Sequence, residues 1–277
     1  GHPNHAMTLA RALRVCRQPL RRGPALLLAQ RACAPPLPSR ALRSVQVERR
    51  AGPQGDEQIQ RGITLLEDGN VVGAVSEFQE AARQGSAVGN FYLGLAYDNL
   101  IGSNARGEPP VASDPAAAFR CYERAAKGGH AEAMHNLSLC YRRGEGVDVH
   151  VGKAFEWLEC SAAVGSDRAQ YNAALALDPL HPPWGTPGAT SAETAMIPKD
   201  PARAVALYRE AAAQGHSKAK VNLGIALYTG TGCAKDAAAA EALWHEAVEE
   251  GVEQARFCLS NMEGKSGALP NYFGADK

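Results

Sequence analysis

Five glycines recur along the chain at spacings of 44, 36, 50 and 36 residues, and the residue types around each glycine agree. Eleven residues before each glycine stands an alanine, seven before it a large apolar residue, and four before it a small residue. A unit of 36 residues that repeats in this way is typical of a solenoid, in which each unit buries its apolar face only against its neighbours. The five glycines, called anchor glycines below, are Gly85, Gly129, Gly165, Gly215 and Gly251.

Residues 114–147 show how one such unit is expected to fold. Asp114 and Pro115 are typical of a helix start, because the carboxylate caps free N–H groups and proline suits the first helical position. Apolar residues follow at helical spacing, and Gly129 ends this first helix because glycine readily adopts the left-handed conformation. A second apolar stripe, and so a second helix, leads to Tyr141. The residues at the five predicted starts of the first helices are Asn70, Asp114, His150, Asp200 and Asp236.

These units predict an all-α protein, an α/α solenoid of about five helix-turn-helix repeats. The chain resembles the Sel1-like repeat proteins, which are relatives of the tetratricopeptide arrays. The resemblance rests on residues 153–158 (KAFEWL), on residues 129–133 (GHAEA) leading to Tyr141, and on glycine loops at residues 144–147 (GEGV) and 230–233 (GTGC). It covers roughly residues 70–263, although the third unit starts with His150 and lacks the glycine loop.

The chain divides into four parts. Residues 1–50 form a basic segment, residues 51–69 a linker and an N-terminal capping helix, residues 70–263 the solenoid, and residues 264–277 a C-terminal tail without a motif. We expect the capping helix to have Asp56 as its N-cap and to cover the exposed face of the first repeat, as the terminal unit of a solenoid requires.

The basic segment holds ten arginines, no lysine and one acidic residue. From Met7 onward it reads as a short amphipathic, Arg-rich helix, which is typical of a mitochondrial transit peptide. The alternatives are a secretory signal, for which the apolar core at residues 25–29 is too short, and a disordered basic tail. We therefore expect a mitochondrial protein.

The remainder of the chain carries 19 basic and 28 acidic residues, a net charge of −9. This excess of acidic residues argues against nucleic acid as a partner, because phosphates must be neutralised by basic side chains. The sequence contains no run of 18 apolar residues, so no membrane span is predicted.

The cysteines and histidines do not form a recognisable site. After the basic segment five cysteines remain, an odd number at differing repeat positions, so no disulfide framework is predicted and the matrix fits better than the intermembrane space. Cys121, Cys140 and Cys258 occupy apolar positions, whereas Cys160 is expected to face outward as the thiol to test for reactivity. The spacings of His and Cys match no metal motif, and residues 264–266 (GKS) lack the rest of a phosphate-binding loop. We expect no metal, no cofactor and no catalysis.

The charged residues of the first helices that lie opposite the alanine stripe are the candidate binding residues. By resemblance, these helices line the concave side of the solenoid, where partners dock; an ordinary solvated helix face is the alternative. We expect Glu156 and Glu159 to face solvent together. The candidates are Arg120, Glu123, Arg124, Glu156, Glu159, Arg209, Glu210 and Glu246, with Trp184 in the longer insert at residues 178–199.

The sequence thus predicts a non-catalytic adaptor or assembly scaffold in mitochondria that binds one or more protein partners. The resemblance suggests either an assembly factor for respiratory complexes or a stress-signalling adaptor. A structural subunit built permanently into a large mitochondrial complex is the main alternative, and an enzyme is disfavoured because no group of residues stands out from the repeat pattern.

Overall fold

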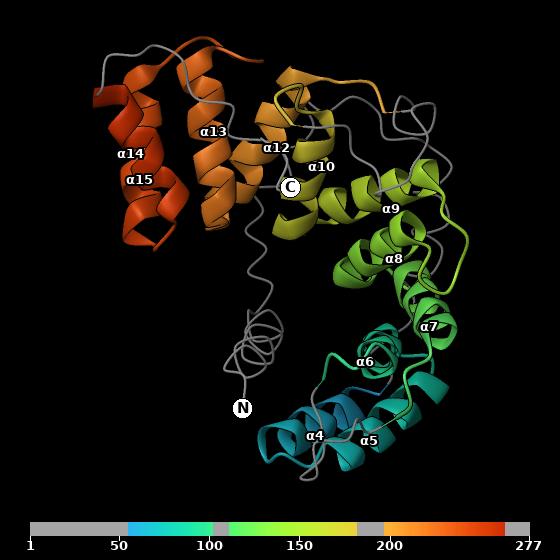
Figure 1. Cartoon of the computed structure of the whole chain (residues 1–277). Coiled ribbons are helices and arrows are strands. Elements are labelled where there is room, and N and C mark those ends of the chain that lie inside the picture. Colours follow the sequence, from blue (N-terminus) through green and yellow to red (C-terminus); the bar gives the residue numbers. More distant parts are fainter. Residues whose placement is uncertain (1–54, 102–110, 182–196, 264–277) are drawn as a thin grey trace, which may run out of the picture. The chain divides into compact units, whose positions relative to one another are not determined.

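The structure, a computed structural model, describes residues 55–101, 111–181 and 197–263. Within these ranges every regular element is an α-helix, as predicted (Figure 1). The basic segment, Trp184 and the C-terminal tail lie outside the described residues. The helices are α4 (Asp56–Glu67), α5 (Val71–Arg83), α6 (Ala87–Tyr97), α7 (Pro115–Lys127), α8 (Ala131–Arg143), α9 (Val151–Val164), α10 (Asp167–Leu177), α12 (Pro201–Ala213), α13 (Ser217–Thr229), α14 (Ala237–Glu249) and α15 (Glu253–Glu263).

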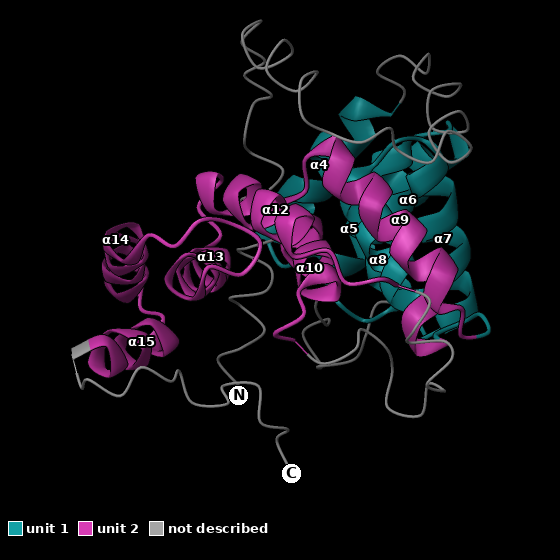
Figure 2. Cartoon of the chain, turned by 90° about the horizontal axis from the view of Figure 1, so that it is seen from above, with its two compact units in different colours: residues 1–140, 145–148 teal, residues 141–144, 149–277 magenta. Residues whose placement is uncertain are grey.

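The helices group into two compact units (Figure 2). Unit 1 runs as far as Cys140 and includes Glu145–Asp148, so it holds α4 to α7 and most of α8. Unit 2 holds Tyr141–Gly144 and everything from Val149 onward. Inside each unit, helices that are consecutive in the sequence pack against each other, α4 on α5 and α5 on α6 for example, or α12 on α13 and α13 on α14. Local packing of this kind is what a repeat array requires.

All five predicted starts of the first helices are confirmed. In each case the side chain accepts a hydrogen bond from the backbone N–H three residues later, at 2.9 to 3.2 Å. His150 departs from the pattern in residue type but not in role, because its Nδ1 accepts from the N–H of Lys153. These bonds satisfy backbone donors that the helix itself leaves free.

The prediction that Asp56 caps α4 is wrong. The N-cap is Gly55, in the left-handed conformation, and Asp56 is the first helical residue. A Cβ on Gly55 would lie 3.0 Å from Cα of Ala81, so the chain approaches α5 too closely at this point for a side chain. Asp56 still favours the helix start through its charge, since acidic residues in the first turn interact well with the helix dipole.

The anchor glycines end the first helices as predicted. All five have φ between 84° and 109°, which is the left-handed region that costs glycine little. At Gly129, Gly165, Gly215 and Gly251 a Cβ would have nothing within 4 Å of it, so backbone conformation rather than space selects glycine there.

The core is built from one large residue per repeat, seven positions before the anchor glycine. Phe78, Tyr122, Leu158, Tyr208 and Trp244 are all 0 % exposed. Three of them pack on a glycine of the preceding helix, where an added Cβ would lie only 2.4 to 2.5 Å from the ring. These glycines, which we call socket positions, are Gly62 facing Phe78, Gly94 facing Tyr122, and Gly224 facing Trp244. Helix α4 therefore receives the ring of α5 just as α6 receives that of α7.

The glycine loops are also explained by close packing. A Cβ on Gly146 would lie 2.1 Å from the carbonyl oxygen of Pro115, and one on Gly232 would lie 2.2 Å from that of Pro201. Each loop thus rests on the first turn of an earlier helix, α7 or α12. Only glycine fits at these two contacts.

Candidate protein-binding surface

The candidate binding residues lie on α7, α9, α12 and α14, at three positions that recur before the anchor glycine. Nine residues before it stand Arg120 and Glu156; six before it stand Glu123, Glu159 and Arg209; five before it stand Arg124, Glu210 and Glu246. All but Glu123 and Glu159 are exposed, and those two are half-buried.

In unit 1 the candidates form a short charged face on α7. The Glu123 carboxylate lies 3.1 Å from the Lys127 ammonium one turn later, and Arg120 lies 4.0 Å from the capping carboxylate of Asp114. Exposed pairs of this kind contribute little to stability. With Arg124 also exposed, the face presents two guanidinium groups to solvent.

In unit 2, Glu159 does not face solvent beside Glu156, and that prediction is wrong. Glu159 of α9 forms an ion pair with Arg203 of α12, and its side chain is only 11 % exposed. Burial raises the pKa of Glu159, and the nearby Arg203 guanidinium opposes that change. The pair joins two helices of unit 2 that lie on either side of α10 in the sequence, so only Glu156 remains an exposed carboxylate on α9.

Glu210 is held by a hydrogen bond from the side-chain amide of Gln170, in the same unit. Gln170 of α10, which is buried, donates from Nε2 to the Glu210 carboxylate at 2.9 Å and accepts from Gln214 at 2.7 Å. Burial raises the pKa of the Glu210 carboxyl group. Glu246 is likewise engaged, because Lys220 of α13 lies 2.9 Å from it and 2.6 Å from Glu250. We therefore take Glu156 and Arg209, both exposed, as the main surface candidates in unit 2.

The prediction that Cys160 faces outward is also wrong, because Cys160 is only 4 % exposed. Helix α9 buries residues around more of its circumference than the alanine stripe predicts, with Ala162 buried as well as Leu158 and Ser161. Burial raises the pKa of the Cys160 thiol to about 11, so little reactive thiolate forms. The expectation that Cys121, Cys140 and Cys258 are core residues is confirmed.

A buried polar cluster at the base of the longer insert was not predicted. The Tyr208 hydroxyl donates to the Asp178 carboxylate at 3.1 Å, and Asn222 Nδ2 lies 3.3 Å from both the Tyr208 hydroxyl and His181 Nε2. Lys199 donates to the backbone carbonyl groups of Asp178 at 3.0 Å, of Ala176 at 3.1 Å and of His181 at 3.4 Å. His181 and Lys199 flank residues 182–196, so the two ends of this segment are fastened together.

The pKa shifts in this cluster favour a structural role for it. Burial lowers the pKa of His181 to about 4, and Asp178 opposes that change while Lys199 adds to it. Burial also raises the pKa of Tyr208, and the neighbouring carboxylate of Asp178 adds to it. A neutral imidazole and a neutral phenol therefore surround the carboxylate, which suits a hydrogen-bonded clamp rather than proton transfer near neutral pH.

Unit 1 repeats the central contact of this cluster. The Tyr122 hydroxyl donates to the Asp98 carboxylate at 2.6 Å. Asp98 and Asp178 both stand 13 residues after their anchor glycine, and each is the first residue of a segment that lengthens its repeat, residues 98–113 and 178–199. The signal was therefore present in the sequence, as an aspartate at one register paired with a tyrosine seven residues before the next anchor glycine.

His130 and His216 cap the first turns of α8 and α13. Each accepts through Nδ1 from the N–H three residues later, and each ring stacks on an aromatic ring, Phe91 at 4.3 Å and Tyr171 at 4.4 Å respectively. Among the residues that the structure describes, no group of three His, Cys, Asp or Glu side chains could hold a metal ion.

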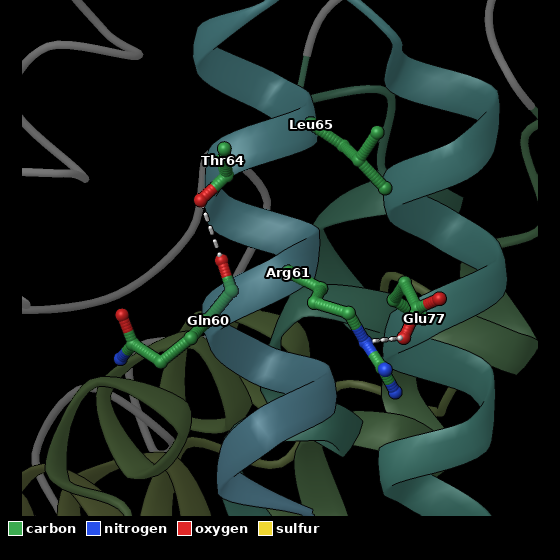
Figure 3. Close-up of a pocket in the computed structure, with 5 residues that line it drawn as sticks. All are labelled: Gln60, Arg61, Thr64, Leu65 and Glu77. Atoms are coloured by element: carbon green, nitrogen blue, oxygen red, sulfur yellow. Dashed lines mark hydrogen bonds and ion pairs between the residues drawn. The ribbon is translucent and has the colours of Figure 1, made fainter.

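A pocket of about 370 Å³ lies on unit 1 between α4 and α5 (Figure 3). Gln60, Arg61, Thr64, Leu65 and Glu77 line it. Arg61 donates to Glu77 at 3.1 Å, and Thr64 donates to the carbonyl of Gln60 at 3.0 Å (Figure 3). Arg61 also donates to Glu57 of its own helix at 3.1 Å. Since the guanidinium group is already held by two carboxylates of its own helix pair, these side chains join α4 to α5.

A comparison with protein families decides what kind of chain this is. The profile of a family described as Sel1 repeat matches residues 87–130, 131–166, 194–216 and 217–252, which together make up half of the sequence. The chain belongs to the Sel1 repeat family. Three of the four matched segments begin at the first residue of a helix, which is α6, α8 or α13. If each repeat is counted from the start of its family match, α7, α9 and α14 are second helices, although they are the first helices of the units defined by the anchor glycines. The candidate residues on these three helices therefore lie on the second helix of a Sel1 repeat.

A solved structure of a Sel1 repeat protein from Oxalobacter formigenes shows the same fold. It is 23 % identical in sequence, with a TM-score of 0.59 over 84 % of this chain and 92 % of the other. Among curated proteins, the "DAP3-binding cell death enhancer 1" of Rattus norvegicus is 29 % identical over 119 residues. That match covers 43 % of this Sel1 repeat chain and only 19 % of the rat protein.

The Sel1 repeat fold suggests a scaffold for protein–protein interaction, and Sel1 repeats imply protein partners. None of the helices in the three described ranges is long and apolar enough to cross a membrane.

Proposed function

We propose that this Sel1 repeat chain is a non-catalytic adaptor or assembly scaffold in mitochondria, and that a protein partner docks on the face of α9 and α12 in unit 2. Glu156 on α9 and Arg209 on α12 are exposed charged residues of this face. Arg120 and Arg124 on α7 form a separate candidate face in unit 1, and Trp184 in the longer insert remains a further candidate contact.

The observation that carries the proposal is that buried and exposed positions alternate in a fixed pattern along each first helix. The alanine, the large residue and the small residue that recur before each anchor glycine are buried and pack within the array. The charged residues at the intervening positions, such as Glu156 and Arg209, are left in solvent. A repeat array gains an extended surface in this way, and charges at the rim of an interface steer association.

Nucleic acid is not the proposed partner, because the chain after residue 50 carries a net charge of −9. Catalysis is not proposed either, since the titratable groups that the structure brings together serve as caps and clamps. The location rests on the Arg-rich segment that begins at Met7. The odd number and differing repeat positions of the five later cysteines favour the matrix over the intermembrane space.

Proximity labelling with the full chain in intact mitochondria tests this function. The proposal expects a small set of labelled proteins that also bind the purified chain in vitro. DAP3 is the first purified protein to try, because the rat relative is named for binding it. Stoichiometric copurification within one large complex would instead favour a permanent structural subunit, and failure of every labelled protein to bind the purified chain would contradict the adaptor.

A further inference from the structure

Helix α7 carries arginines at two registers where the corresponding helices of the other repeats carry no basic residue. Arg120 stands nine residues before its anchor glycine and Arg124 five before it, so the two lie one turn apart on the same side of the helix. The residues at these registers in the other four repeats are Ser76, Glu156, Ala206 and Ala242 at the first, and Glu80, Cys160, Glu210 and Glu246 at the second. The repeat pattern therefore does not explain the two arginines.

The stability of α7 does not explain the arginine pair either. Like charges one turn apart on a helix repel each other, so the pair disfavours the helix. Arg124 and Lys127 lie in the last turn, where a positive charge suits the helix dipole, but Arg120 lies before that turn. The Arg120 guanidinium is 4.0 Å from the Asp114 carboxylate, and its side chain is 60 % exposed, so this contact contributes little.

The surroundings of this pair in unit 1 are acidic. The described residues of unit 1 include 12 acidic and five basic residues, and three of the five basic residues lie on α7. The other two, Arg61 and Arg83, form ion pairs with glutamates of the same helix or the next one. Arg124, in contrast, is exposed and forms no ion pair with any other described residue. The exposed positive charge in the described part of unit 1 is therefore concentrated on α7.

We propose that an acidic helix of a protein partner docks on α7, with two of its carboxylates on the guanidinium groups of Arg120 and Arg124. A guanidinium group binds a carboxylate through two parallel N–H···O bonds. Two glutamates one turn apart on a helix have Cβ atoms about 5–6 Å apart, which matches the spacing of the two arginines. Lys127 adds a third positive charge, because its exposed pair with Glu123, at 3.1 Å, is weak enough for a partner carboxylate to displace.

The acidic surroundings also determine where such a partner binds. A negatively charged helix is repelled by the carboxylates of the other helices of unit 1 and attracted only where the arginines stand, so repulsion and attraction together select α7. The inference rests on the proposed function in one respect, that the partner is a protein. It concerns α7 in unit 1 and not the face of α9 and α12.

A peptide with two glutamates tests the proposal. The probe is a fluorescein-labelled, alanine-rich helical peptide whose two Glu residues stand four positions apart, and fluorescence anisotropy gives its Kd for the full chain. In every protein compared, Gln replaces the ten arginines of residues 1–50, so that the basic segment does not bind the probe. The chain should bind the peptide, and binding should weaken as salt rises, because exposed charges are screened.

Arg120→Gln combined with Arg124→Gln should raise this Kd about tenfold or more. The melting temperature should not fall, since the repulsion between the two arginines is removed. The matched control is Arg61→Gln with Arg83→Gln, which removes the same number of positive charges from unit 1 and should leave the Kd unchanged. Absence of binding to the chain with both α7 arginines, or an equal loss in the control, would overturn the proposal.

Two further measurements separate this proposal from its alternatives. A peptide with phosphoserine in place of both glutamates that binds when the glutamate peptide does not would assign α7 to a phosphorylated partner and would overturn the proposal. Self-association that Arg120→Gln with Arg124→Gln abolishes, measured by sedimentation, would assign α7 to a second copy of the chain and would overturn it too. If a protein found by proximity labelling binds the chain while the glutamate peptide does not, this inference fails and the proposed function stands.

Discussion

Gly62 of α4 and Phe78 of α5 meet so closely that a Cβ on Gly62 would lie 2.5 Å from Cε1 of the Phe78 ring. The ring itself is 0 % exposed and stacks on Tyr92 at 4.4 Å between ring centroids. Because the ring has no room to retreat, the size of the residue at position 62 sets the distance between the two helices.

Gly62→Ala should lower the free energy of unfolding by about 1–3 kcal/mol, because one added methyl group overpacks the contact. Phe78→Leu on its own should also cost stability, by leaving a cavity. In the double variant the two costs should partly cancel, since Ser138 and Leu158 stand at these two registers in the third repeat. Urea unfolding of the four proteins measures the coupling. Additive costs would mean that the two residues do not share one space.

The clamp at the base of the longer insert should make stability depend on pH. His181 has a pKa of about 4 in the folded chain, below its ordinary value of 6.5, chiefly because it is buried among Asp178, Lys199, Tyr208 and Asn222. The unfolded chain therefore binds the proton more readily. The stability that neutral His181 contributes is complete above pH 6.5 and is lost as the pH falls from 6.5 toward 4.

His181→Gln should remove this part of the pH dependence, a difference on the order of 1 kcal/mol after allowance for solvent screening. Unfolding in urea at about pH 7.5 and at about pH 5 measures it. The exposed His245→Gln serves as the matched control and should behave as the wild type does. An unchanged loss of stability in His181→Gln would show that the imidazole is not the responsible group.

Thiol labelling should follow burial. Among the five cysteines of residues 55–263, the half-buried Cys233 should react first with a maleimide. Cys160 and Cys258 should react last, since burial raises the pKa of each to about 11. Mass mapping after timed quenching gives the order, and early labelling of Cys160 would mean that α9 does not pack as described.

The sequence was sufficient for the features that depend on neighbouring residues. Helix starts such as Asp114 and helix ends such as Gly129 were predicted because a cap or a left-handed glycine acts within one turn. The alanine and large-residue positions were predicted because their register repeats five times.

The features that sequence reasoning missed depend on residues brought together by packing. Glu159 and Arg203 stand on different helices, 44 residues apart, so nothing near Glu159 signals that it is covered. Cys160 lies on a helix that is buried on more than one side. The cluster of Asp178 and its partners draws residues from both ends of an insert, whose length breaks the repeat register.

The basic segment should direct import. Residues 7–50 fused to a fluorescent reporter should send it to mitochondria, because an Arg-rich segment with few acidic residues and an amphipathic pattern is typical of a transit peptide. Replacing Arg11, Arg14 and Arg17 with Glu should keep the reporter in the cytosol. Fluorescence microscopy decides the matter, and a cytosolic reporter with the native segment would contradict the proposed location.

The central claim is that a partner docks on the face of α9 and α12, and a charge swap tests it most directly. Glu156→Lys with Arg209→Glu leaves the net charge unchanged and alters two exposed side chains outside the core. It therefore leaves packing intact, whereas Glu159 is unsuitable because its reversal would break the pair with Arg203. The control is Lys218→Glu with Glu249→Lys, another exposed pair of opposite charges in unit 2.

The decisive measurement is the Kd of the partner found by proximity labelling, for the wild type and both double variants, beside their melting temperatures. The account predicts that the swap at Glu156 and Arg209 raises Kd at least tenfold, about 1.4 kcal/mol of binding free energy, with a melting temperature close to that of the wild type. The control should bind as the wild type does. An unchanged Kd in the Glu156 and Arg209 variant, or an equal loss of binding in the control, would contradict it.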